Sequence, residues 1–187
     1  MAVEAADNSG VGGVWRPVWI NKVALPGAAE DNLIQDAGFE GESETWGRTI
    51  MAGQFTFAID TDHANSGTSS ARIECTAPGT EEDKVKYRTD IWGRWHQSIG
   101  NINPSKTYRF RAWVRTSAGL NGQAALWVTN TEVSTASVNV LNTRGRWHEA
   151  TIEAINPKGD TVGVCLNLMQ GMGTVWFDDV ELVAEGE

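Results

Sequence analysis

The sequence predicts an all-β fold in which antiparallel sheets pack face to face. Alternating or β-branched apolar segments recur between clusters of Gly, Pro, Asn and Ser, and none shows a helical period. About ten strands without helical crossovers indicate an antiparallel sandwich or barrel. The chain of 187 residues has the size of one domain, which suits two packed sheets best.

The expected strands are bounded by the turn residues on either side. They cover residues 54–59, 69–76, 84–92, 94–99, 107–116, 123–130, 136–141, 147–155, 161–169 and 174–183.

The tryptophan content and the net charge limit the kinds of molecule that the protein can be expected to bind. Nine Trp against two Tyr is an unusual ratio. A formal net charge of -9 argues against nucleic acid or an anionic membrane surface as the partner. Neutral partners such as sugars are unaffected, and no stretch is long and apolar enough to insert in a membrane.

Residues 1–31 form an N-terminal extension ahead of the expected module, residues 32–187. Residues 18–25 (VWINKVAL) echo residues 175–182 (VWFDDVEL). The extension is either the remnant of a preceding similar module or an added edge strand. Residues 1–13 lack the basic and apolar regions of a signal peptide, so a leader was removed or the chain is an internal module.

Two cysteines, Cys75 and Cys165, lie in different strand-like segments. They form one disulfide or are two small core residues, and the spacing leaves both open.

Four segments carry a resemblance to a known group of proteins. They are residues 32–40 (NLIQDAGFE) followed by Trp46, residues 63–73 (HANSGTSSARI), residues 104–115 (PSKTYRFRAWVR) and residues 173–182 (GTVWFDDVEL). In this order and spacing they resemble the carbohydrate-binding modules of families 4, 9, 16 and 22. The resemblance implies a jelly-roll β-sandwich, secreted and covalently linked to a catalytic domain in a parent protein.

The same resemblance implies a structural Ca²⁺ ion. By match to the family motifs, Glu40 and Asp178 supply carboxylates and Gly38 and Thr68 supply carbonyl oxygens. Calcium prefers such hard oxygen ligands. The alternative is that Glu40 and Asp178 are solvated turn carboxylates.

A glycan site needs exposed aromatic planes with hydrogen-bonding side chains beside them. Strand alternation places Trp127 outside the core. The segment before residues 104–115 matches the place where the family mounts a stacking aromatic, so Trp92 is the first candidate and Trp95 the second. The expected hydrogen-bonding partners are Arg94, Gln97, Arg111, Asn130 and Asn167.

No pair of carboxylates resembles a glycosidase dyad, because Asp178 and Asp179 are adjacent on a strand and should face opposite sides. We therefore expect a non-catalytic module that targets an attached glycoside hydrolase or similar enzyme to a glycan such as β-glucan or xylan. The alternatives are a structural or protein-binding sandwich, a module for an anionic polysaccharide, suggested by Arg109, Arg111 and Arg115, or a lyase or hydrolase.

Overall fold

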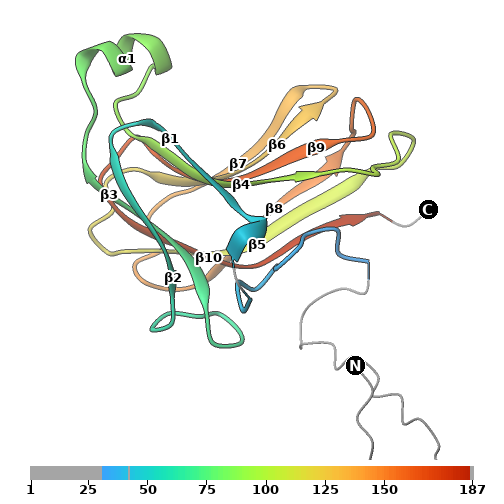
Figure 1. The fold of residues 1–187 in the computed structure, drawn as a ribbon, viewed down its shortest axis with the longest axis horizontal. Helices are drawn as coiled ribbons and strands as arrows, with labels where there is room; N and C mark the ends of the chain where they lie inside the picture. Colours follow the sequence, from blue (N-terminus) through green and yellow to red (C-terminus); the bar gives the residue numbers. More distant parts are fainter. Residues whose placement is uncertain (1–30, 42, 186–187) are drawn as a thin grey trace, which may run out of the picture.

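The computed structural model describes residues 31–41 and 43–185, which form two antiparallel five-stranded sheets packed face to face (Figure 1). We call the sheet with strand order β1-β4-β9-β6-β7 sheet A and the sheet with order β2-β3-β10-β5-β8 sheet B. The predicted all-β sandwich of the jelly-roll type is confirmed.

The strands and helices have the following bounds. They are the 3-10 helix Ser43–Thr45, β1 Gly47–Ala52, β2 Gln54–Asp60, β3 Ser70–Ala77, α1 Glu81–Tyr87, β4 Trp92–Ile99, β5 Tyr108–Thr116, β6 Gln123–Thr131, β7 Ser134–Val140, β8 His148–Ile155, β9 Val162–Met169 and β10 Gly173–Ala184.

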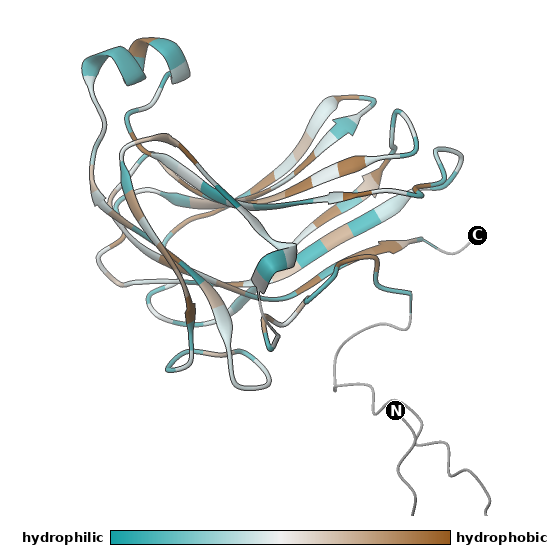
Figure 2. Ribbon diagram, in the orientation of Figure 1, coloured by the Kyte–Doolittle hydropathy of each residue, from teal (hydrophilic) through white to brown (hydrophobic). Residues whose placement is uncertain are grey.

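The core lies between the sheets and is built by strand alternation. On β5, Tyr108, Phe110, Ala112 and Val114 are buried while the residues between them are half-buried, and Figure 2 shows this alternation of hydropathy along the strand. From sheet A, every second residue of β9 from Val162 to Leu168 packs into the same core. Burial of these faces stabilises the sandwich.

One predicted strand is wrong and one strand was missed. Residues 81–87 form helix α1, although we expected a strand over residues 84–92. Thr80 caps this helix and forms a reciprocal capping box with Asp83. The pattern Thr-x-x-Asp was present in the sequence, but seven residues are too few to show a helical period. Strand β1 was not predicted.

The expected opening segment lies along β10. Leu33 donates its backbone N–H to the carbonyl of Leu182, and Val180 donates to the carbonyl of Ala37. The Asn32 side chain adds bonds to the backbone of Val180 and Leu182. The first and last segments of the module are thereby joined, while the echo over residues 18–25 lies outside the described residues.

Both cysteines are buried and free, so the disulfide alternative is wrong. Cys75 is on β3 of sheet B and faces the core, whereas Cys165 is on β9 of sheet A and faces away from it. Within the described part of the chain, no helix has the length and apolar character needed to cross a membrane.

Candidate functional site

The outer face of sheet A carries an aromatic pair. We call this surface the tryptophan face, formed by alternate residues of five strands. They are 47 and 49 of β1, 92 to 98 of β4, 163 to 169 of β9, 123 to 129 of β6 and 135 to 139 of β7.

Trp92 and Trp127 lie against each other on this face, with ring centroids 5.3 Å apart and planes inclined at 61°. Both side chains are half-buried, although each points away from the core. Tyr87, at the end of α1, packs edge-on against Trp92 with centroids 6.3 Å apart. The contact extends the aromatic surface to α1. Sequence reasoning did not predict this role of Tyr87, because the expected strand over residues 84–92 left no helix there.

Asn167 lies beneath Trp92 and orients its ring. Its Oδ1 accepts a hydrogen bond of 3.0 Å from the indole Nε1 of Trp92. Its Nδ2 donates to the carbonyl oxygens of Ala125 and Cys165. Because Asn167 is fully buried, the predicted direct sugar contact is wrong. The residue acts by holding the Trp92 ring in one orientation.

Arg94 and His96 follow Trp92 along the outward side of β4. The Arg94 Nη1 lies 3.6 Å from the Cys165 Sγ, and its guanidinium carbon lies 5.9 Å from the Trp92 ring centroid. His96 lies across Gly47, where a Cβ atom would come within 2.5 Å of the imidazole Cε1. Burial lowers the pKa of His96, and the positive charge of Arg94 lowers it further.

Two predicted sugar-binding residues are structural, and both lie on the inner side of β4. Trp95 is fully buried and packs edge-on against Phe57 at 5.6 Å. Gln97 is buried and bridges backbone groups of Gln35 and Thr45 through its amide. Neither side chain can contact a surface ligand, because alternation along β4 turns both toward the core.

Arg111 is also excluded from the tryptophan face, because β5 belongs to sheet B. It forms two hydrogen bonds of 2.9 Å with Glu181 and a third with Glu149. Arg109 donates to the same Glu181, which is buried. Carboxylates on the opposite side of the molecule therefore engage Arg109 and Arg111, whereas Arg115 of the same strand stacks over Trp176.

Asn130 lies at the end of β6 beyond the tryptophan pair. Its backbone has a φ of 63°, and its Nδ2 donates to the carbonyl of Thr161 at 2.6 Å. The side chain holds a neighbouring loop, so the structure does not bring Asn130 together with Trp92.

The four residues expected at the calcium site lie close together. A Cβ atom at Gly38 would be 3.6 Å from the Glu40 Cγ and 3.9 Å from the Asp178 Oδ1. Thr68 donates both its N–H and its hydroxyl to the Glu40 carboxylate. Burial opposes ionisation of Glu40, but hydrogen bonds from Thr68 and Ser69 outweigh it and lower the pKa of Glu40.

Asp178 is fully buried and accepts backbone N–H bonds from Asn65, Ser66 and Asp179. Burial raises its pKa to about 6 despite these bonds. Asp179 binds the side chains of the same Asn65 and Ser66, so the prediction that the two acids face opposite sides is wrong. The reason is an irregularity in β10, where Asp179 has a φ of 47°.

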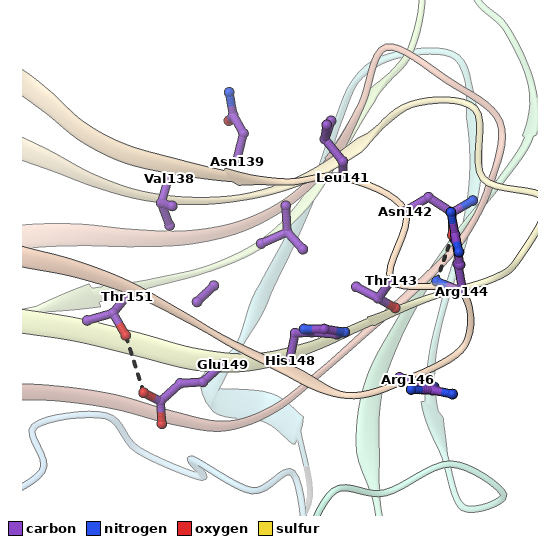
Figure 3. Close-up of a pocket in the computed structure, with 12 residues that line it drawn as sticks. Val138, Asn139, Leu141, Asn142, Thr143, Arg144, Arg146, His148, Glu149 and Thr151 are labelled. Carbon is purple, nitrogen blue, oxygen red and sulfur yellow. Dashed lines mark hydrogen bonds between the residues drawn. The ribbon is translucent and has the colours of Figure 1, made fainter.

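A groove of about 830 Å³ opens between the edge strands β7 and β8 and the loop that joins them (Figure 3). Val138 and Leu141 lie on one side, and His148 and Glu149 lie on the other. Among the described residues that line it, Glu149 is the one carboxylic acid, and Arg111 and Thr151 donate to that side chain.

The fold places the chain among jelly-roll sandwiches, a class that includes carbohydrate-binding modules. TmCBM61, solved in complex with β-1,4-galactotriose, superposes with a TM-score of 0.63 at 18% sequence identity, covering 82% of this chain and 99% of its own. A family 16 carbohydrate-binding module gives 0.58 at 16% identity, covering 81% of this chain and 99% of its own.

The same fold also occurs in enzymes. A cyclase from Fischerella sp. TAU, solved with 4-(1H-indol-3-yl)butan-2-one, gives a TM-score of 0.61 at 17% identity over 84% of this chain and 98% of its own. No protein-family model matches the sequence, and no curated protein matches it. The likeness therefore establishes the fold, and function must be argued from the site.

Proposed function

We propose that the chain is a non-catalytic glycan-binding module that uses the tryptophan face. The observation that carries the proposal is the Trp92 and Trp127 pair, half-buried on a sheet face that points away from the core. Large aromatic side chains on an outer face lose burial energy unless a ligand covers them. Flat apolar sugar faces are suitable partners.

The geometry of the pair favours a chain over a flat crystalline surface. Since the ring planes are inclined at 61°, one planar surface cannot lie parallel to both. A polysaccharide that turns between successive sugars can stack on each ring. Sites of this kind bind with dissociation constants of roughly millimolar to micromolar, or about -4 to -8 kcal/mol.

β-Glucan and xylan are our candidate polymers, and β-1,4-galactan joins them because of the ligand bound to TmCBM61. The module would be secreted and would hold a linked catalytic domain near its substrate, which raises the effective concentration of the enzyme. Incubation with each polymer, followed by analysis of released sugars, tests the non-catalytic part of the proposal. Accumulation of cleavage products would contradict it.

The binding test uses two tryptophan variants and one matched control. Affinity gels that contain each polysaccharide should retard the wild-type protein, and Trp92→Ala and Trp127→Ala should migrate as in a gel without polymer. Trp113→Ala removes a half-buried tryptophan from the outer face of sheet B and should be retarded like wild type. Equal retardation of all four proteins would remove the tryptophan face from the binding site.

We also propose that calcium binds between the loop at residues 36–41 and β10. The donors that would hold it are the carboxylates of Glu40 and Asp178 and the carbonyl oxygens of Gly38 and Thr68, a set of hard oxygen atoms. In the same loop, the Asp36 Oδ2 is buried and has no hydrogen-bond partner among the described residues. Within those residues no three acidic, His or Cys side chains cluster, so backbone carbonyls must complete the ligand set.

Each of the two carboxylates retains capacity for a cation. Glu40 and Asp178 each accept three hydrogen bonds from the protein, while a carboxylate offers about four lone-pair positions. Calcium at about 100 times its dissociation constant would stabilise the fold by about 2.7 kcal/mol, which raises Tm by roughly 5–10 °C. A calorimetric titration with CaCl₂ that shows no heat and no shift in Tm would refute this site.

A further inference from the structure

We propose that the tryptophan face recognises an anionic group on the glycan, a carboxylate or a sulfate, through Arg94. The inference rests on the proposed glycan-binding function and names the class of ligand for the same site.

The charge of the tryptophan face differs from that of the whole chain. The protein has a formal net charge of -9, yet none of the outward positions that define this face is Asp or Glu. Burial lowers the pKa of His96, so this imidazole is largely neutral at pH 7. Arg94 supplies the positive charge of the face at that pH.

Arg94 is held without a carboxylate partner among the described residues. Its Nη1 bonds to the Cys165 Sγ at 3.6 Å, and its Nε is buried with no hydrogen-bond partner in that part of the structure. Arg111 shows what the protein does elsewhere, since two acids engage its guanidinium. A half-buried guanidinium beside the tryptophan pair, with no acid at the outward positions of the face, is a suitable partner for an anionic ligand.

The position of Arg94 suits a group carried by a sugar that stacks on the pair. Arg94 and Asn167 are cross-strand partners, and Cys165 is the cross-strand partner of Trp127. The guanidinium therefore reaches over β9 toward Trp127 while its carbon stays 5.9 Å from the Trp92 ring centroid. A sugar ring on either indole would bring its substituents beside the Arg94 donors.

The planar guanidinium can meet a carboxylate or sulfate with two parallel hydrogen bonds. A charge-assisted contact of this kind should favour the charged polymer by about tenfold or more over its neutral counterpart. The preference should decrease with salt, because the site remains partly exposed.

The test compares chemically matched polymers. Binding of the full chain would be measured by calorimetry to oligogalacturonate, glucuronoxylan and alginate, each beside its carboxyl-reduced form, and to sulfated galactan beside its desulfated form. The two arms distinguish a carboxylate from a sulfate. Wild type should bind at least one charged polymer about tenfold more tightly than its neutral partner.

Three variants assign the preference to one residue. In Arg94→Gln the ratio of charged to neutral affinity should fall to about 1, and in Arg94→Lys it should be intermediate, because charge remains without the planar fork. Arg115→Gln makes the same change in net charge on the outer face of sheet B, where Arg115 stacks over Trp176, and should keep the wild-type ratio.

The outcomes separate this inference from the proposed function. Equal binding of charged and neutral forms by wild type, or a preference that survives in Arg94→Gln, would overturn the role of Arg94 and leave glycan binding intact. Absence of binding to every polymer would overturn the proposed function and this inference with it.

Discussion

In calcium-free buffer, Asp178 should make the protein less stable as the pH rises from 4 to 7. Burial raises the pKa of this carboxyl in the folded protein from its ordinary value of 3.8 to about 6. Below pH 3.8 it is protonated in both states. Between the two pKa values the folded state retains the proton that the unfolded state has lost, so the stabilising contribution is lost as the pH rises through about 6.

The size of the effect follows from the separation of the two pKa values. Each pH unit between them changes the free energy of unfolding by about 1.4 kcal/mol, so the rise to about 6 corresponds to about 3 kcal/mol. Asp178→Asn cannot titrate and lacks this pH dependence. The substitution also replaces one of the two carboxylate oxygens that accept the three surrounding backbone N–H bonds. This loss costs about 1–3 kcal/mol at all pH values.

The assay is urea unfolding followed by tryptophan fluorescence, with EGTA present, at several pH values between 4 and 7.5. The difference in the free energy of unfolding between wild type and Asp178→Asn reports the titration of this carboxyl together with its Coulombic coupling to the neighbouring Asp179. From pH 4 to pH 7 the stability of wild type relative to Asp178→Asn should fall by about 3 kcal/mol. A difference that stays constant over this range would refute the reasoning, and saturating CaCl₂ should restore wild-type stability at pH 7.

The remaining predictions concern residues that the structure moves away from the proposed binding site. Trp95→Ala should lower the free energy of unfolding by about 3–5 kcal/mol, measured by urea unfolding, because it empties a fully buried site. Gln97→Leu should cost about 1–3 kcal/mol by leaving the backbone groups of Gln35 and Thr45 unpaired, without a change in glycan affinity in gels. Glu181→Gln should cost about 1–3 kcal/mol, because it removes the charge that Arg109 and Arg111 share while Arg111 keeps Glu149, and an unchanged Tm would contradict this.

The side chains of β4 were only partly placed correctly from the sequence. Trp92, Arg94, Trp95 and Gln97 were all assigned to one glycan face, although alternation along a strand turns Trp92 and Arg94 to one side and Trp95 and Gln97 to the other. The alternation with a period of two is visible in the sequence. The start of β4 at Trp92 was not predicted, because the expected strand over residues 84–92 overlaps helix α1.

Burial on an outer face could not be predicted from alternation. Asn167 points away from the core as expected, yet the Trp92 ring covers it and uses its amide oxygen. Arg111 likewise points outward as expected, but on the other sheet, where Glu181 and Glu149 engage it. Which sheet a strand joins, and what lies over an outward side chain, depend on pairing between segments far apart in the chain.

The sequence by itself determined the class of fold, because alternating apolar residues between turn signals permit little besides an antiparallel sandwich. It also made Trp92, Trp127 and Arg94 candidates for the binding face, because residue type and strand phase are local properties. Only the tertiary structure decided that the two indoles meet at 5.3 Å, that Asn167 lies beneath them, and that none of the described outward positions of sheet A is an acid. The physical reason is that strand order and register come from the summed burial of the whole core, which no local pattern contains.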